Sequence, residues 1–117
     1  MFGFERLEIF QLSLEMVEVI YGMTSCFPDR EKFALVTQMN RAAVSVSSNI
    51  AEGYSRLTNK DKKRMINIAY GSLMEIVCQC KIANNLGYID EEQYIEFYKN
   101  AQRLSVKINN FNNAIEC

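Results

Sequence analysis

The chain has 117 residues, of which 49% are hydrophobic and 23% are charged, and these values exclude a mainly disordered, collagen-like or low-complexity protein. The length predicts one domain over residues 1–117. The sequence holds no histidine, which removes the commonest metal ligand and the usual general base at neutral pH. Its formal net charge is −1, so binding of nucleic acid would depend on local charge and not on the total.

The four cysteines, Cys26, Cys78, Cys80 and Cys117, are predicted to be reduced thiols of a cytoplasmic protein. The start of the chain is charged and amphipathic and shows no signal-peptide pattern. Cys78 and Cys80 lie two residues apart, so on a helix they point to different sides and cannot form a disulfide with each other. No apolar run approaches the roughly 18 residues that a membrane span requires, so no membrane partner is predicted.

The first predicted helix covers residues 5–26 and carries two apolar rows. The row expected to face the core has 3-4 spacing and consists of Leu7, Phe10, Leu14, Val17 and Tyr21. The second row, on another face, consists of Ile9, Met16, Ile20 and Met23. A lone bundle needs one row per helix. The second row, together with Ile68, Tyr70 and Val77 further along the chain, therefore predicts a homo-oligomer.

The second predicted helix covers residues 29–52 and follows Phe27 and Pro28, which end the first. Its expected core row is Leu35, Met39, Ala42, Val46 and Ile50, with Phe33, Val36 and Ala43 beside it. Gly53 is expected to end this helix, because glycine takes the left-handed conformation without steric cost.

The third and fourth predicted helices cover residues 59–86 and 91–116. Thr58 caps the third and Gly87 ends it, while Asp90 and Gln93 form a capping box for the fourth. Their core rows have 3-4 spacing and consist of Ile66, Ala69, Leu73, Ile76, Cys80 and Ala83, and of Tyr94, Phe97, Ala101, Leu104, Ile108, Phe111 and Ile115. No segment alternates as a strand does, and the connections are short. The sequence therefore predicts an all-α, antiparallel up-down-up-down four-helix bundle.

A polar row runs along the second helix and consists of Arg41, Ser45, Asn49 and Glu52. The third helix offers Ser72 and Glu75, beside Gly71, which is expected to let two backbones approach closely. In an antiparallel pair Arg41 would meet Glu75, with hydrogen bonds from Asn49 and Ser72 between them. We favour a satisfied polar network that sets the register of two helices, and the alternative is a binding or catalytic cleft.

No group of residues predicts catalysis, a metal site or a cofactor. Glu52 and Glu75 form a carboxylate pair, but di-metal sites in bundles need Glu-x-x-His pairs, and the chain has no histidine. The spacing of Cys78 and Cys80 is wrong for a zinc knuckle, and Cys80 falls on the core row as a small hydrophobe. The sequence therefore predicts a protein that is not an enzyme.

The most distinctive charged stretch is residues 56–64, RLTNKDKKR, in which five basic residues stand against one acidic residue, a local charge of +4. The basic residues are Arg56, Lys60, Lys62, Lys63 and Arg64. Cations at a helix N-terminus oppose the helix dipole, so their presence favours a function over a merely solvated helix start. The function indicated is contact with the phosphates of nucleic acid.

Residues 41–56, RAAVSVSSNIAEGYSR, resemble the signature R-A-A-x-S-I-x-x-N-I-A-E-G-x-x-R of the four-helix-bundle proteins encoded in intervening sequences of 23S ribosomal RNA genes. Four further pieces agree with that family: Phe27-Pro28 with Glu31, Gln38, residues 69–75 and residues 86–89. The resemblance covers nearly the whole chain and implies the family and its fold.

The resemblance also extends to the accessory variability determinant proteins of diversity-generating retroelements, which form a pentameric barrel, bind nucleic acid and associate with a reverse transcriptase. It implies a homopentamer here, and the matching positions are Arg41, Asn49, Glu52, Gly53, Arg56, Gly71, Ser72 and Glu75. The chain departs at Ser47, where family members often have proline. It is also slightly acidic, whereas the nucleic-acid-binding relatives are strongly basic, so residues 56–64 are the main support for such binding.

Two functions remain open at this point. The first is a non-enzymatic cytoplasmic homo-oligomer that binds structured RNA or DNA through phosphate contacts, with modest specificity because phosphates carry no sequence information. The second is a protein-interaction scaffold or accessory subunit for a polymerase or a ribosome-associated factor, without direct nucleic-acid binding. The acidic balance and the second apolar row favour the second function.

Overall fold

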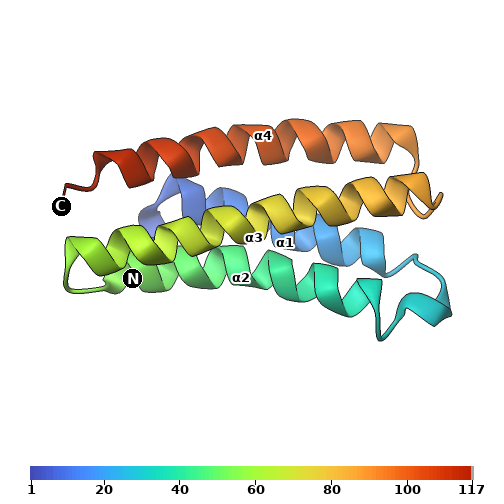
Figure 1. Cartoon of the computed structure of the whole chain (residues 1–117), viewed down its shortest axis with the longest axis horizontal. Coiled ribbons are helices and arrows are strands. Elements are labelled where there is room, and N and C mark those ends of the chain that lie inside the picture. The colour runs from blue at the N-terminus through green and yellow to red at the C-terminus, as the bar shows by residue number, and fades with distance from the viewer. Residues whose placement is uncertain (117) are drawn as a thin grey trace.

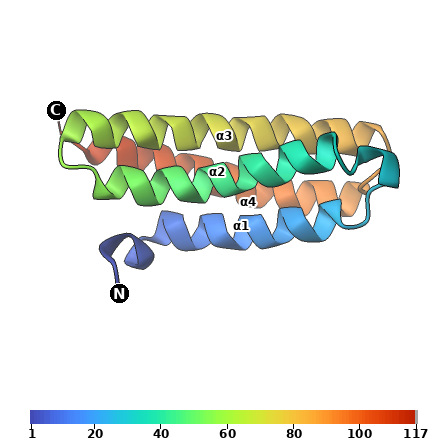
Figure 2. The same ribbon diagram turned by 90° about the horizontal axis from the view of Figure 1, so that it is seen from below.

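The computed structural model describes residues 1–116, which form four long helices lying side by side (Figure 1). The helices are α1 (Glu8–Thr24), α2 (Leu35–Ser55), α3 (Asn59–Asn85) and α4 (Glu91–Ala114), with two short 3-10 helices, η1 (Gly3–Arg6) and η2 (Asp29–Glu31). Residues 1–116 contain no strand, which confirms the all-α fold. The α2–α3 connection, η1 and the end of α4 lie at one end of the molecule, and the other two connections lie at the opposite end (Figures 1 and 2).

The core is one cluster formed by all four helices. Every position of the row predicted for α3 is 0% exposed: Ile66, Ala69, Leu73, Ile76, Cys80 and Ala83. The middle of the α4 row and most of the α2 row are buried as well. Phe33 is an exception, because it is 88% exposed ahead of α2 and not beside the core as predicted. Within the described part of the chain, no helix is both long and apolar enough to cross a bilayer.

Helix α1 buries the opposite row from the one predicted. Its core row consists of Ile9, Ser13, Met16, Ile20 and Met23. In the predicted row, Leu14 and Tyr21 are 43% and 47% exposed, while Leu7, Phe10 and Val17 are partly buried at the edge of the core. Both rows have helical spacing, and a serine on the true core row hides it in the sequence. That Ser13 is satisfied, because it donates to the Phe10 carbonyl at 2.6 Å and accepts from Ser47 of α2 at 2.8 Å.

Helix α2 begins six residues later than predicted, at Leu35 instead of Asp29. Asp29–Glu31 form the 3-10 turn η2, and the non-helical backbone of Ala34 (φ −124°, ψ −103°) separates it from α2. The Glu31 carboxylate accepts a hydrogen bond from Tyr88 at 2.7 Å. This contact with the α3–α4 connection holds η2 apart from the helix that its sequence would otherwise extend.

Gly53 does not end α2, because the helix continues through it to Ser55. A Cβ at Gly53 would lie 3.0 Å from the Met65 Cβ and 3.1 Å from the Ile66 Cδ1, so this glycine lets α2 and α3 approach closely. Gly71, for which the sequence predicts that role, is exposed, and a Cβ there would meet nothing within 4 Å. Both predictions about these glycines were wrong.

The predicted caps of α3 and α4 are confirmed. The Thr58 hydroxyl accepts from the Asp61 amide at 3.2 Å. Asp90 and Gln93 form a capping box, with bonds of 2.8 and 3.0 Å. Gly87 has a φ of +79°, the left-handed conformation expected of glycine directly after a helix.

Three cysteines can be described, and they differ in exposure. Cys26 and Cys78 are exposed, Cys80 is buried, and all three are free thiols, whereas Cys117 lies outside the described residues. Burial raises the pKa of Cys80 to about 12. Near pH 8 this thiol therefore stays protonated and shielded, and the thiolate is the reactive form.

We expect a maleimide reagent near pH 8 to modify Cys26 and Cys78 in the folded protein and to reach Cys80 only after unfolding. Peptide mapping by mass spectrometry assigns the modified sites. Modification of Cys80 as fast as that of Cys78 in native protein would show that the core opens around α3.

Candidate nucleic-acid interface

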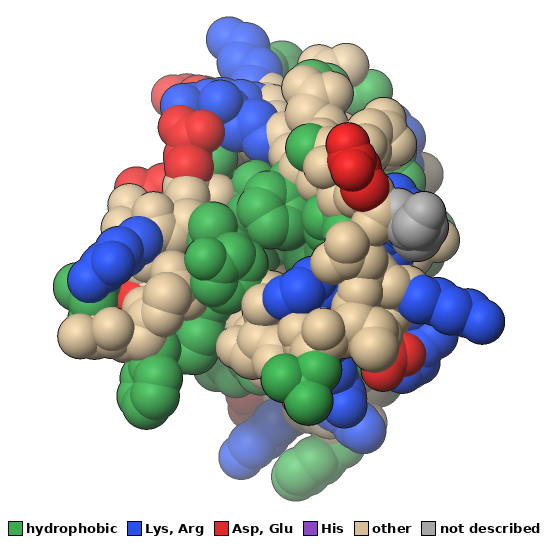
Figure 3. Space-filling view, turned by 90° about the vertical axis from the view of Figure 1, so that its left-hand side faces the viewer, with side chains coloured by type: hydrophobic (Ala, Val, Ile, Leu, Met, Phe, Trp, Pro, Cys, Tyr) green, Lys and Arg blue, Asp and Glu red, His purple; other side chains and the backbone are tan. Residues whose placement is uncertain are grey.

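The five basic residues predicted to contact phosphate surround the α2–α3 connection. Arg56 is the C-cap residue of α2, and the four others, Lys60, Lys62, Lys63 and Arg64, belong to the first two turns of α3. The Thr58 cap sets where α3 starts and so where these side chains project. Figure 3 looks onto this end of the bundle and shows Lys and Arg side chains distributed over it.

Two of these lysines bind the C-terminal ends of neighbouring helices. The Lys62 Nζ donates to the Tyr54 carbonyl at 2.6 Å, in the last turn of α2. The Lys63 Nζ donates to the Asn112 carbonyl at 2.7 Å and to the Ile115 carbonyl at 3.3 Å, at the end of α4. The last carbonyls of a helix lack intrahelical partners and carry partial negative charge, so an ammonium group stabilises them. These contacts explain both lysines without nucleic acid, which corrects the argument from the dipole of α3 alone.

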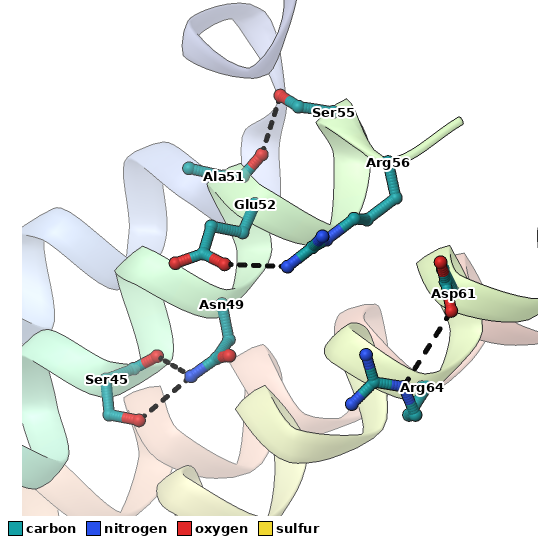
Figure 4. Close-up of polar contacts among 8 residues, drawn as sticks. All are labelled: Ser45, Asn49, Ala51, Glu52, Ser55, Arg56, Asp61 and Arg64. Carbon is teal, nitrogen blue, oxygen red and sulfur yellow. Dashed lines mark hydrogen bonds and ion pairs between the residues drawn. The ribbon is translucent and has the colours of Figure 1, made fainter. Parts of the chain in front are cut away.

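The other three cations are available to a ligand. Arg56 pairs with Glu52 at 3.3 Å, and Arg64 lies 3.9 Å from Asp61 (Figure 4). All four side chains are at least 44% exposed, and such pairs contribute little to stability. Lys60 makes no hydrogen bond or ion pair with any described residue. The arginines can therefore exchange an exposed carboxylate for a phosphate at little cost.

The polar row of α2 meets α3 at one point. Ser45 and Ser72 lie 2.9 Å apart, hydroxyl to hydroxyl, and link the two helices. The Asn49 amide donates to the Ser45 carbonyl at 2.8 Å and to its hydroxyl at 3.0 Å (Figure 4), so Asn49 bonds within α2 and not to Ser72. A small polar contact between the helices thus lies where the sequence predicts a network.

Arg41 and Glu75 line the same open hollow between α2 and α3, but they form no ion pair in the described structure. Glu75 accepts a hydrogen bond from Gln79 at 3.1 Å, and Glu52 faces Arg56. The structure therefore keeps the two carboxylates apart. In residues 1–116 no three His, Cys, Asp or Glu side chains lie close enough together to hold a metal ion.

Two separated motif pieces meet at the opposite end of the bundle. The Tyr88 ring lies 5.2 Å from that of Phe27, its hydroxyl donates to Glu31 at 2.7 Å, and Arg30 lies 5.9 Å from the ring centroid. Phe27 and Glu31 belong to the α1–α2 connection and Tyr88 to the α3–α4 connection. These motif residues join the two connections.

An apolar groove between α1 and α2 was not foreseen as a site. It is lined by Phe4, Phe10, Leu14, Val17, Val44, Ser47, Ser48 and Ala51. On α1 the lining comes from the row predicted to be core, and on α2 Val44 and Ala51 recur seven residues apart. That recurrence is the signal in the sequence that could have revealed the α2 side of the groove.

These features define an all-helical bundle. Its polar contacts link neighbouring helices, the ends of helices and the connections between them. The family model for 23S rRNA-intervening sequence protein matches residues 5–110, and the chain belongs to this family. The crystal structure of a protein with unknown function from the S23 ribosomal protein family, from Bacteroides thetaiotaomicron, superposes with a TM-score of 0.83. The two sequences are 20% identical over 91% of this chain and 96% of that chain, a likeness that concerns the fold. None of the curated proteins matches this chain.

Proposed function

We propose that this protein is a non-enzymatic, cytoplasmic, up-down-up-down four-helix bundle that self-associates and binds RNA or DNA through phosphate contacts at the α2–α3 end. The observation that carries the proposal is the cluster of three exposed cations, Arg56, Lys60 and Arg64, around one connection. Lys60 has no partner among the described residues, and the arginines face only exposed carboxylates. Lys62 and Lys63 bind carbonyl groups at the helix ends, so we do not count them among the phosphate contacts.

Salt dependence tests the proposal, because each neutralised phosphate releases counterions. Three contacts give a slope of about −2 to −3 in a plot of log K against log salt concentration. We expect the Lys60→Gln/Arg64→Gln variant to bind labelled RNA and duplex DNA more weakly and to lower the magnitude of this slope by about 1.4–1.8. Fluorescence anisotropy from low to near-physiological salt measures it.

The matched control is Lys32→Gln/Lys99→Gln, which removes the same charge from exposed positions on other parts of the molecule. It should leave the slope within error of that of the natural protein. A Lys60→Gln/Arg64→Gln variant with an unchanged slope would remove the α2–α3 end from consideration as the binding site.

The proposed self-association uses the apolar groove between α1 and α2. Leu14 and Val44 are 43% and 42% exposed there, next to Phe10 and Val17. Exposed apolar patches of this kind mark protein contacts. The family resemblance implies five copies, and a ring would repeat the three cations around its rim and raise avidity. Light scattering that finds a monomer at micromolar concentration contradicts this part of the proposal, and Leu14→Glu should produce that monomer.

The same groove supports a second candidate, a protein-interaction scaffold or accessory subunit for a polymerase or ribosome-associated factor that does not touch nucleic acid. The net charge of −1 favours it over a polyanion-binding role. A protein partner that co-purifies after nuclease treatment, together with no RNA or DNA binding at low salt, would establish the scaffold in place of the first proposal.

A further inference from the structure

Large apolar side chains are exposed to solvent at the end of the bundle that carries the cations. Leu57, in the α2–α3 connection, is 98% exposed and directly follows Arg56. Phe2, next to η1, is 75% exposed, and Tyr54 in the last turn of α2 is 39% exposed. None of the three belongs to the core cluster. Figure 3 shows hydrophobic side chains lying among Lys and Arg on this face.

The N-terminal segment is packed against this end and forms one surface with it. A Cβ at Gly3 would lie 2.9 Å from the Tyr54 ring, whose centroid is 5.5 Å from the Lys62 Nζ. The segment is folded, because the Glu5 carboxylate accepts from the Phe2 amide at 2.8 Å. Figure 2 shows η1 at the same end as the start of α3. Ordered structure thus holds Phe2 at the end of the bundle that carries the cations (Figure 2).

The exposed ring of Phe2 has a defined orientation relative to a second aromatic ring. It lies nearly parallel to the Phe4 ring, with 4° between the planes and 6.2 Å between the centroids. The Phe4 ring in turn meets Phe10 of α1 edge-on at 4.9 Å. The stack ends at Phe2, whose 75% exposure leaves ring surface available to a flat partner.

We infer that the α2–α3 end takes single-stranded nucleic acid, with the Phe2 ring and the Leu57 side chain against unstacked bases and Arg56, Lys60 and Arg64 on phosphates. The inference rests on the proposed function and names its ligand class. A duplex keeps the faces of its bases inside the stack, where these side chains cannot reach them. A single strand presents both, and aromatic groups beside cations are the pattern that binds such strands.

The charge of the protein favours the same conclusion. Three available cations on a chain of net charge −1 give weak electrostatic attraction, which near-physiological salt screens further. Binding of useful strength therefore needs a contribution that salt does not screen, and base contacts supply it. Basic and apolar groups also suit an anionic membrane surface. Glu52 and Asp61 lie beside the two arginines, however, and a flat anionic surface would meet those carboxylates as well.

The experiment compares one labelled strand of mixed sequence, prepared as RNA and as DNA, alone and annealed to its complement, by fluorescence anisotropy with the protein. We expect the single strand to bind at least about 10-fold more tightly than the duplex. Phe2→Ala should weaken single-strand binding by about 10-fold. Leu57→Ala should weaken it by a smaller factor, because leucine has no ring to stack on a base, and both variants should leave duplex binding unchanged. Both residues are largely exposed, so both variants should have the same unfolding temperature as the natural protein.

Leu86→Ala and Tyr98→Ala are the matched controls, because these apolar side chains are 54% and 43% exposed away from the α2–α3 end. They should leave both affinities unchanged.

Equal binding of single strand and duplex, with a salt slope that depends on Lys60 and Arg64, overturns the inference and leaves the proposed function standing. Absence of binding to every one of these RNA and DNA probes overturns both. Sedimentation with phosphatidylserine vesicles but no binding of RNA or DNA would assign the surface to a membrane and also overturns both.

Discussion

Replacing Gly53 by alanine should lower the free energy of unfolding by about 1–2 kcal/mol, although alanine is the better helix former. The added Cβ would lie 3.0 Å from the Met65 Cβ and 3.1 Å from the Ile66 Cδ1. The Met65 Cβ is fixed to the backbone of α3 and cannot turn away, so α2 and α3 have to separate. Because Ile66 is fully buried, that separation disturbs the core. Urea denaturation followed by circular dichroism measures the loss.

Gly71→Ala is the control, and it should change stability in the opposite direction. Gly71 is exposed within α3, and a Cβ there meets nothing within 4 Å. Alanine at such a site is expected to raise the free energy of unfolding by about 0.5–1 kcal/mol, since it restricts the unfolded chain. If Gly53→Ala were as stable as Gly71→Ala, the close approach of α2 and α3 at Gly53 would be refuted.

The fold was most predictable where a helix carries one uninterrupted apolar row. The row of α3, from Ile66 to Ala83, is buried at every predicted position. Helix α1 has two candidate rows, and local spacing cannot choose between them. The buried row contains the polar Ser13, and only the folded structure shows that Ser47 of α2 satisfies its hydroxyl across the helix interface. Such a partner lies 34 residues away in the chain.

The sequence predicts which basic residues form the candidate site, but not which groups each of them contacts. Local charge identified residues 56–64 correctly as a basic cluster. The partners of Lys63 lie 49 and 52 residues further along the chain, so only the folded structure shows that this lysine binds the end of α4. The late start of α2 was missed for the same reason. The Glu31 carboxylate accepts a hydrogen bond from Tyr88, which lies 57 residues away in the sequence.

Replacing Lys63 by methionine should lower the free energy of unfolding by about 1–2 kcal/mol. The ammonium donates to two carbonyls at the end of α4, at 2.7 and 3.3 Å, in a partly buried setting. Methionine keeps much of the packing of the alkyl stem, so the variant removes the charge and the hydrogen bonds with little change in volume. Urea denaturation measures the stability, and hydrogen exchange should show faster opening of the last turn of α4.

Lys60→Met separates the two roles that the basic cluster combines. Lys60 has no partner in residues 1–116, so its loss should change the free energy of unfolding by less than about 0.5 kcal/mol. The same variant should reduce the magnitude of the salt slope of RNA binding by about 0.7–0.9, the value for one phosphate contact. Lys63→Met should do the reverse, with lower stability and an unchanged slope. If Lys63→Met instead reduced the slope as Lys60→Met does, Lys63 would leave the α4 carbonyls to contact phosphate, and RNA binding would then loosen the end of α4.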